Sequence, residues 1–291
     1  MTLELALWAM LYPNHLPDRQ VSWQWGMTLC HPIPGTCHTR ATFNPMDLIL
    51  SDIHSNLHAL KTVLRFARRR IFQRYVVLGD LVGYGAFPNE TVDLIRQLEP
   101  LTVVRGNHDR ACAAHGVDLS FSLPARTAVT WTQGQLTEAN ATYLQELPSG
   151  PLSVDGEYQI AHGSPLDEDE YLLHPREALT AFDGSSSSLC FFGHTHLPGG
   201  YELDDQAQRL TCLEFETGIW FQLRDGCKYL VNPGSVGQPR DRDPRISFMT
   251  YDPIKHRVKL HRLEYDHVGA AGAIRAAGLH PTLAERLQHG I

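Results

Sequence analysis

The sequence lacks any long hydrophobic run. An apolar stretch near its start, LALWAMLY at residues 5–12, is short and is followed directly by Pro13. A helix that spans a bilayer needs about 20 apolar residues. A secretory signal needs basic residues ahead of its apolar segment, where this chain has Glu4. We therefore expect no membrane span, no secretory leader and no membrane partner.

An excess of positive charge is also missing. The chain has 25 lysines and arginines against 32 aspartates and glutamates, a formal net charge of -7. Proteins that bind nucleic acid are usually basic, so the balance argues against a nucleic-acid partner and against a nuclease. A small phosphorylated substrate is compatible with it, because local charge, above all that of any bound metal, decides such binding. The sequence carries no indication of an oligomeric state.

Cysteines are few and scattered. The six occur at positions 30, 37, 112, 190, 212 and 227. With no secretory signal, we interpret them as reduced thiols of a cytoplasmic protein. The segment CHPIPGTCH at residues 30–38 contains two cysteines and two histidines, but its spacing fits no common zinc pattern.

Residues 1–45 have a different composition from the rest of the chain. They hold three of the five tryptophans and five prolines, and they show neither helical nor strand periodicity. We predict that they form a poorly ordered or mis-annotated extension that the protein can lose, with Met46 as the possible true start. Residues 46–291 are predicted to form one domain.

Strands alternate with helices from Met46 onward. Apolar runs predict strands at 47–54, 75–80, 101–109, 158–165 and 188–196, and spacings of three and four predict helices over 57–71, 89–99 and 126–147. Several more strands follow residue 210, and two short helices close the chain. This alternation predicts an α/β fold with parallel pairing and strands covered on both faces. The late strands predict a second sheet packed against the first.

Polar side chains follow five of these predicted strands at the point where each ends. The candidates are Asp52, His54, Asp80, Asn107, His162, His194 and His196. Ligands of open α/β sheets bind at the carboxyl ends of the strands, so we expect all seven at one edge of one sheet. Carboxylates, an amide oxygen and imidazoles suit divalent transition metals. Seven ligands are too many for one ion and enough for two, with Asp80 as the shared bridge.

Five ordered motifs resemble the calcineurin-like metallophosphoesterases. They are SDIHSN, VVLGDLVGYG, VRGNHD, IAHGSP and FFGHTH, and LVNPGSVGQPRDRDPR downstream resembles the small bacterial branch of that superfamily. The resemblance covers about residues 47–290. It implies a four-layer αββα sandwich of two packed mixed sheets, with a dimetal centre at the carboxyl ends of the strands.

The resemblance also implies individual roles. One metal would be held by Asp52, His54, Asp80 and His196. The other would be held by Asp80, Asn107, His162 and His194. His108 would contact the substrate phosphate and act as proton donor, and Asp109 would orient its imidazole.

The activity implied is hydrolysis of phosphate esters by a hydroxide that bridges two divalent transition-metal ions. We expect manganese, with iron, zinc or nickel as alternatives, and a phosphodiester, nucleotide or dinucleoside polyphosphate as substrate. The alternatives are a non-catalytic scaffold of the same fold and a nuclease. Related protein Ser/Thr phosphatases carry a further aspartate and arginine after the GD motif. The loop at residues 81–85 lacks both, which argues against protein phosphatase activity.

Two arginines are weaker candidates. Arg105 and Arg240 would suit bidentate binding of a phosphate, and a purely structural role is equally compatible with the sequence. The acidic segment DEDEY at residues 167–171 is read as a solvated loop, with one wall of the substrate cleft as the alternative.

Overall fold

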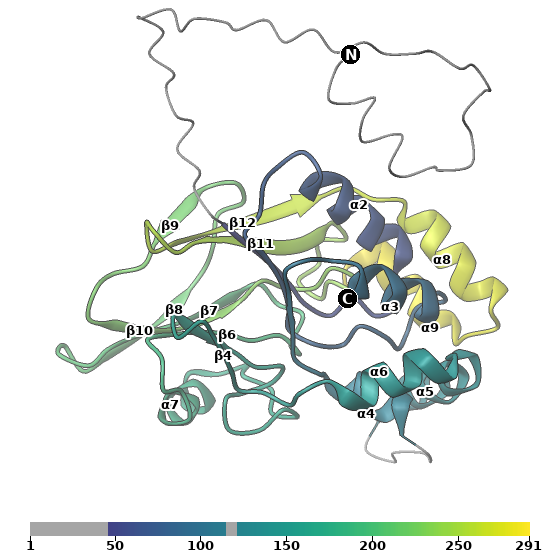
Figure 1. The fold of residues 1–291 in the computed structure, drawn as a ribbon, viewed down its shortest axis with the longest axis horizontal. Coiled ribbons are helices and arrows are strands. Elements are labelled where there is room, and N and C mark those ends of the chain that lie inside the picture. The colour runs from purple at the N-terminus through teal and green to yellow at the C-terminus, as the bar shows by residue number, and fades with distance from the viewer. Residues whose placement is uncertain (1–45, 115–120) are drawn as a thin grey trace, which may run out of the picture. The chain divides into compact units, whose positions relative to one another are not determined.

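The computed structural model describes residues 46–114 and 121–291 (Figure 1). The predictions for the N-terminal extension, including the segment at residues 30–38, therefore fall outside the described residues. In the part of the chain that is described, no helix is both long and apolar enough to cross a lipid bilayer.

Two six-stranded mixed sheets form the centre of the domain. The first has the strand order β3-β2-β1-β11-β12-β9. Its members are β1 (Asp47–Leu50), β2 (Arg74–Val77), β3 (Leu101–Val103), β9 (Trp220–Gln222), β11 (Ile246–Asp252) and β12 (Arg257–Leu263). The first three strands run parallel, and β11 joins β1 antiparallel.

The second sheet has the strand order β4-β5-β6-β10-β7-β8. Its members are β4 (Leu152–Val154), β5 (Tyr158–Ile160), β6 (Leu189–Phe191), β7 (Gly199–Asp204), β8 (Arg209–Leu213) and β10 (Cys227–Asn232). Here β5, β6 and β10 run parallel, while the strands at both edges pair antiparallel.

Alternating side chains divide the core into layers. In β1, Ile49 contacts the core between the sheets, whereas Leu48 and Leu50 face the helices. In β6, Phe191 enters the same central core and Cys190 faces the opposite way. Successive side chains of a strand point to opposite faces, so strands that are apolar throughout are covered on both sides. The expected αββα sandwich is confirmed.

Eight described helices cover the outer faces (Figure 1). They are α2 (Leu57–Ala67), α3 (Pro88–Arg96), α4 (Asn107–Ala113), α5 (Leu123–Gln135), α6 (Glu138–Glu146), α7 (Pro175–Asp183), α8 (His267–Ala276) and α9 (Pro281–His289). Helix α2 packs its buried face on the first sheet, and α7 packs on the second. The Asn56 side chain caps α2 by accepting a hydrogen bond from the Ala59 amide.

The structure corrects several predicted boundaries. The helix predicted over 126–147 is two helices, because Thr137 caps a new one by accepting from the Asn140 amide. The first helix ends at Ala67, so Ile71 is 68% exposed instead of facing the core. The third predicted strand ends at Val103, because α4 begins at Asn107. Strands β4 and β7 were not predicted.

A shortened chain that begins at Met46 is expected to fold. The first sheet starts at Asp47, and the carbonyl of Met46 already accepts a hydrogen bond from the Gln73 amide at 2.8 Å. We expect this chain to keep the metal content and turnover of the full chain, within about twofold, because the described core draws on residue 46 and beyond. Insolubility, or loss of turnover with the metals still bound, would contradict this prediction.

Candidate metal centre

Turns at the carboxyl ends of strands from both sheets form the site. Asp52 and His54 follow β1, Asp80 follows β2, and Asn107 opens α4 after β3. The three histidines at 162, 194 and 196 follow β5 and β6. We expected one edge of one sheet. The structure instead divides the seven residues between two sheets, because β5 and β6 pair with β10 and not with β1–β3.

Five of these residues have left-handed backbone conformations. Their φ angles are 52° for Asp52, 49° for His54, 53° for Asp80, 65° for His194 and 61° for His196. For a non-glycine residue this conformation costs about 1–2 kcal/mol. The surrounding turns nevertheless hold the five residues in this conformation, which directs their side chains toward the site.

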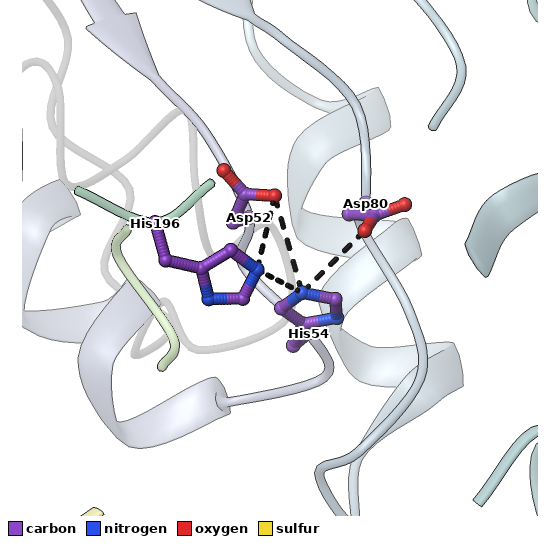
Figure 2. A group of neighbouring side chains, drawn as sticks. All are labelled: Asp52, His54, Asp80 and His196. Carbon is purple, nitrogen blue, oxygen red and sulfur yellow. Dashed lines mark hydrogen bonds and ion pairs between the residues drawn. The ribbon is translucent and has the colours of Figure 1, made fainter. Parts of the chain in front are cut away.

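The first cluster contains Asp52, His54, Asp80 and His196, whose ligand atoms lie within 4.8 Å of one another. Figure 2 shows these side chains converging. The Nε2 atoms of His54 and His196 are 3.1 Å apart. Asp52 Oδ1 lies 3.4 Å from His196 Nε2, and Asp80 Oδ2 lies 3.5 Å from His54 Nε2.

Backbone carbonyls determine which nitrogens of this cluster carry hydrogen. His54 Nδ1 donates to the Val82 carbonyl at 3.0 Å, and His196 Nδ1 donates to the Gln238 carbonyl at 2.6 Å. In a neutral imidazole only one nitrogen carries hydrogen, so both Nε2 atoms present lone pairs to each other. Asp52 Oδ1 is buried without a hydrogen-bond partner among the described residues. Such facing acceptors fit a cation between them.

The second cluster contains Asp80, His162 and His194. His162 Nδ1 donates to the Leu78 carbonyl at 2.7 Å, and His194 Nε2 donates to the Asp169 carbonyl at 3.1 Å. The other two ring nitrogens, His162 Nε2 and His194 Nδ1, face each other at 3.1 Å, and both become acceptors once His162 gives up its second proton. The Asn107 amide oxygen lies 3.1 Å from His162 Nε2 and adds a further acceptor. The structure thus brings all seven predicted ligands together in two acceptor clusters.

Asp80 belongs to both clusters. Its Oδ1 accepts a hydrogen bond from the His108 amide at 2.9 Å, while Oδ2 lies 3.5 Å from His54 Nε2 and 3.4 Å from His162 Nε2. A Cβ on Gly106 would lie 2.0 Å from Asp80 Oδ1, so only glycine fits at that position. Oδ2 would therefore be shared between two ions if each cluster held one.

Burial and mutual charge shift the pKa values of the site. Burial raises the pKa of Asp52 to about 7 and lowers the pKa of His194 to about 3. Burial also lowers the pKa of His162, but the charge and hydrogen bond of Asp80, the charge of Asp52 and the hydrogen bond to the Leu78 carbonyl together raise that pKa to about 10. The carboxylates thus attract positive charge to the nitrogen that faces them, as a metal site requires.

Divalent metal ions are expected to stabilise the fold. The ions would accept the lone pairs of the imidazole nitrogens and carboxylate oxygens that face one another in the clusters. A ligand that binds only the folded state stabilises that state by mass action. With Mn²⁺ at about 100 times its dissociation constant, one site adds about 2.7 kcal/mol, or about 5 °C in melting temperature. Differential scanning fluorimetry of chelator-treated protein with added Mn²⁺ measures this. An unchanged melting temperature, at concentrations where Mn²⁺ binding is measured, would contradict it.

His108 lies beside the clusters and is 4% exposed. The rings of Tyr84 and Phe121 contact it, with centroids 4.4 and 4.8 Å away. A Cβ on Gly83, whose φ is +88°, would lie 2.5 Å from His108 Nδ1. Burial lowers the pKa of His108 to about 4, so in the protein alone its imidazole is neutral at pH 7.

The structure does not show the expected contact between Asp109 and His108. The Asp109 carboxylate accepts hydrogen bonds from three backbone amides, those of Leu81, Val82 and Gly106, at 2.8–3.1 Å. Among the described residues, His108 Nδ1 has no hydrogen-bond partner. Asp109 lies in the first turn of α4, after Gly106, where backbone amides have no partner within the helix. It therefore braces the loop that packs on His108 instead of orienting the imidazole directly.

The two candidate arginines have different surroundings. Arg105 forms two hydrogen bonds with the Glu168 carboxylate at 3.0 and 3.1 Å and does not line the cleft over the metal centre. Its assignment as a phosphate ligand is therefore not supported, because a carboxylate already occupies its donors. Arg240 does line the cleft.

A cleft of about 530 Å³ opens over His108, Asn107 and His194. Sequence analysis missed several of its wall residues, namely Tyr84, Arg110, Phe121 and Arg286. The acidic segment at 167–171 forms one wall instead of a free loop: Asp169 and Tyr171 line the cleft, and the Tyr171 ring lies 3.7 Å from that of His194. An aromatic residue directly after an acidic stretch is the only sequence signal for that wall.

Residues 46–254 match the calcineurin-like phosphoesterase superfamily domain. The chain belongs to this superfamily. The match includes all seven residues of the two clusters, and it identifies the protein as a metal-dependent phosphoric ester hydrolase. The two clusters have the composition that a metal site in such a hydrolase requires.

Two solved structures and one further protein are similar to this chain. A metallophosphoesterase from Sphaerobacter thermophilus is 39% identical, with a TM-score of 0.76 over 85% of this chain and 99% of its own. A hypothetical protein from Pyrococcus horikoshii OT3 has a TM-score of 0.68 at 20% identity, covering 84% and 98% of the two chains. An uncharacterized protein of Methanocaldococcus jannaschii is 36% identical over 246 residues, 83% of this chain and 97% of that protein.

Proposed function

We propose that the chain is a dimetal phosphodiesterase or nucleotide hydrolase, with dinucleoside polyphosphates within its range. The observation that carries this proposal is the pair of acceptor clusters that share Asp80 Oδ2. Imidazole nitrogens, carboxylates and an amide oxygen suit Mn²⁺ and similar transition metals. We propose Mn²⁺, with iron, zinc or nickel as substitutes.

Two bound divalent ions would lower the pKa of a water molecule toward neutrality and neutralise the charge of a phosphate. The protein's own residues then bind and orient the ester. Arg240 lines the cleft, and its guanidinium is available for non-bridging phosphate oxygens. Asn107, His108 and His194 line the cleft on the metal side.

His108 is proposed to donate a proton to the leaving oxygen. Burial lowers its pKa, but the negative charge of a phosphate bound next to the imidazole favours the protonated form and opposes that shift. Gly83 and the rings of Tyr84 and Phe121 restrict the imidazole to one position. Asp109 supports that position through the backbone of residues 81–82.

Hydrolysis of bis-p-nitrophenyl phosphate with added Mn²⁺ tests the proposal. We expect turnover that is lost with a chelator and restored by Mn²⁺. A parallel series with iron, zinc and nickel, and with nucleotide and dinucleotide substrates, would define the metal and the substrate. No turnover with any metal, in protein that binds two equivalents, would favour a non-catalytic scaffold.

A reducing compartment is consistent with the described cysteines. All four, at positions 112, 190, 212 and 227, are free thiols. Disulfides are rare in the reducing cytoplasm, and we propose that the enzyme acts there.

A further inference from the structure

Three arginines line the cleft, and their charges are compensated to different degrees. Arg110 forms ion pairs with Glu168 and with Asp169, the latter at 2.7 Å. Two carboxylates therefore already neutralise this guanidinium and hold it in place. Arg110 serves as a fixed part of the wall rather than as a free anion-binding group.

Arg240 contacts neutral oxygen atoms instead. Its guanidinium lies 3.2 Å from the Gln238 amide oxygen and 3.4 Å from the Tyr84 hydroxyl. Among the described residues, its buried Nε atom has no hydrogen-bond partner. After burial, the positive charge of Arg240 is the largest factor that lowers the pKa of His196. This arginine therefore lies close to the metal ligands and suits the phosphate that is cleaved.

Arg286 has no charge partner among the residues that the structure describes. It is half-buried in the cleft wall, and no described carboxylate lies within ion-pair distance of its guanidinium. Unlike Arg240, it is not among the main charges that shift the pKa values of Asp52, His54 or His196. It therefore lies farther from the metal ligands, within the same cleft.

The helix that carries Arg286 lies beyond the matched superfamily domain. That domain ends at residue 254, whereas α8 and α9 span 267–289 and form the yellow helical pair of Figure 1. Leu283 and Leu287 of α9 are buried in a cluster that also contains Tyr84, whose ring contacts His54 and His108. The position of α9 is thus fixed by packing against the site.

We propose that Arg286 binds a second phosphate group of the substrate, separate from the phosphate that is cleaved. Helix α9 then acts as a specificity element, and the enzyme prefers nucleotides that carry two or more phosphates. This inference rests on the proposed phosphodiester or nucleotide hydrolase activity. An unpaired guanidinium in a cleft of a protein with a net charge of -7 is suited to a fork-shaped contact with phosphate oxygens.

Titration calorimetry with AMP and ADP in the presence of Mn²⁺ tests the inference on the full chain. The ratio of the two dissociation constants is compared between the wild type, Arg286→Gln and Arg286→Lys. Arg275→Gln is the matched control, because Arg275 is an exposed arginine of the neighbouring helix α8 and does not line the cleft. Since each protein meets the same Mn²⁺ complexes of AMP and ADP, differences in the ratio report on the protein.

Wild type and Arg275→Gln should bind ADP more tightly than AMP by the same factor. Arg286→Gln should reduce that factor about tenfold or more, the range for a lost charge-assisted hydrogen bond, and Arg286→Lys should reduce it less. If Arg286→Gln leaves the ratio of the AMP and ADP dissociation constants unchanged, or if the wild type does not bind ADP, the inference is overturned. Absence of turnover of bis-p-nitrophenyl phosphate would instead overturn the proposed activity, and the calorimetric result would still decide the role of Arg286.

Discussion

Replacing Asp80 with alanine is expected to empty both metal positions and to reduce turnover by about 10³-fold or more. Asp80 Oδ2 lies 3.5 Å from His54 Nε2 and 3.4 Å from His162 Nε2, and so faces both clusters. Its loss removes a negative charge from each cluster and leaves buried imidazoles to face one another. Elemental analysis of the purified variant measures the metal content, and steady-state kinetics with bis-p-nitrophenyl phosphate measures the loss of rate.

Three comparisons isolate the shared role. In Asp80→Asn, the amide oxygen can still accept the hydrogen bond that the His108 backbone amide now donates to Oδ1. This variant therefore tests the negative charge without removing that hydrogen bond. His194→Ala and His196→Ala each belong to one cluster and should each lose one ion preferentially. Asp183→Ala removes an exposed carboxylate at the end of α7 and should retain both. Two full equivalents of metal in Asp80→Ala would refute the shared assignment.

His108→Ala should retain both metals and lose activity in proportion to how much the leaving group needs a proton. A p-nitrophenolate leaves readily without protonation, whereas an alkoxide does not. General acid catalysis typically contributes about 10²–10⁴-fold, so we expect a loss of that size on a nucleoside or alkyl diester and a small loss on bis-p-nitrophenyl phosphate. The measurement is the ratio of kcat for the two substrates, with metal content determined in parallel.

The structure changes what is expected of Asp109→Asn. Because the Asp109 carboxylate accepts backbone amides and does not touch His108, this variant should lower thermal stability and reduce kcat on both substrates to a similar extent. An equal loss on both substrates in His108→Ala itself, with metals intact, would mean that His108 binds the phosphate instead of donating a proton. A loss of metal in that variant would make His108 a ligand.

The clustering of the seven candidate ligands was predictable from the sequence, because each follows an apolar run near the carboxyl end of a strand. Asp80, for example, follows β2 after Leu78 and Gly79, and His194 follows β6 at the same spacing. The sheet to which each strand belongs was not predictable, because hydrophobic periodicity does not reveal pairing between distant segments. Strands such as β4 are only three residues long and carry too short a pattern to recognise.

The wall of the cleft was even less predictable. Arg286 enters the site from a helix about 90 residues after His196 in the chain, and its sequence neighbours resemble those of any polar helix. Asp109 illustrates a different limit. Its place in the NHD motif suggested a partner for His108, but backbone amides from two loops, those of Leu81 and Gly106, donate to its carboxylate instead.

The left-handed conformations of five candidate metal ligands have a consequence for the evolution of this chain. Glycine adopts that conformation without the steric penalty that aspartate and histidine meet. In a descendant that no longer needed the activity, random replacement of these residues by glycine would relieve backbone strain, and nothing would select against it. Homologues that have lost the activity should therefore accumulate glycine at positions 52, 54, 80, 194 and 196. Where aspartate or histidine is retained at all five positions despite the strain, we expect that selection still maintains the activity.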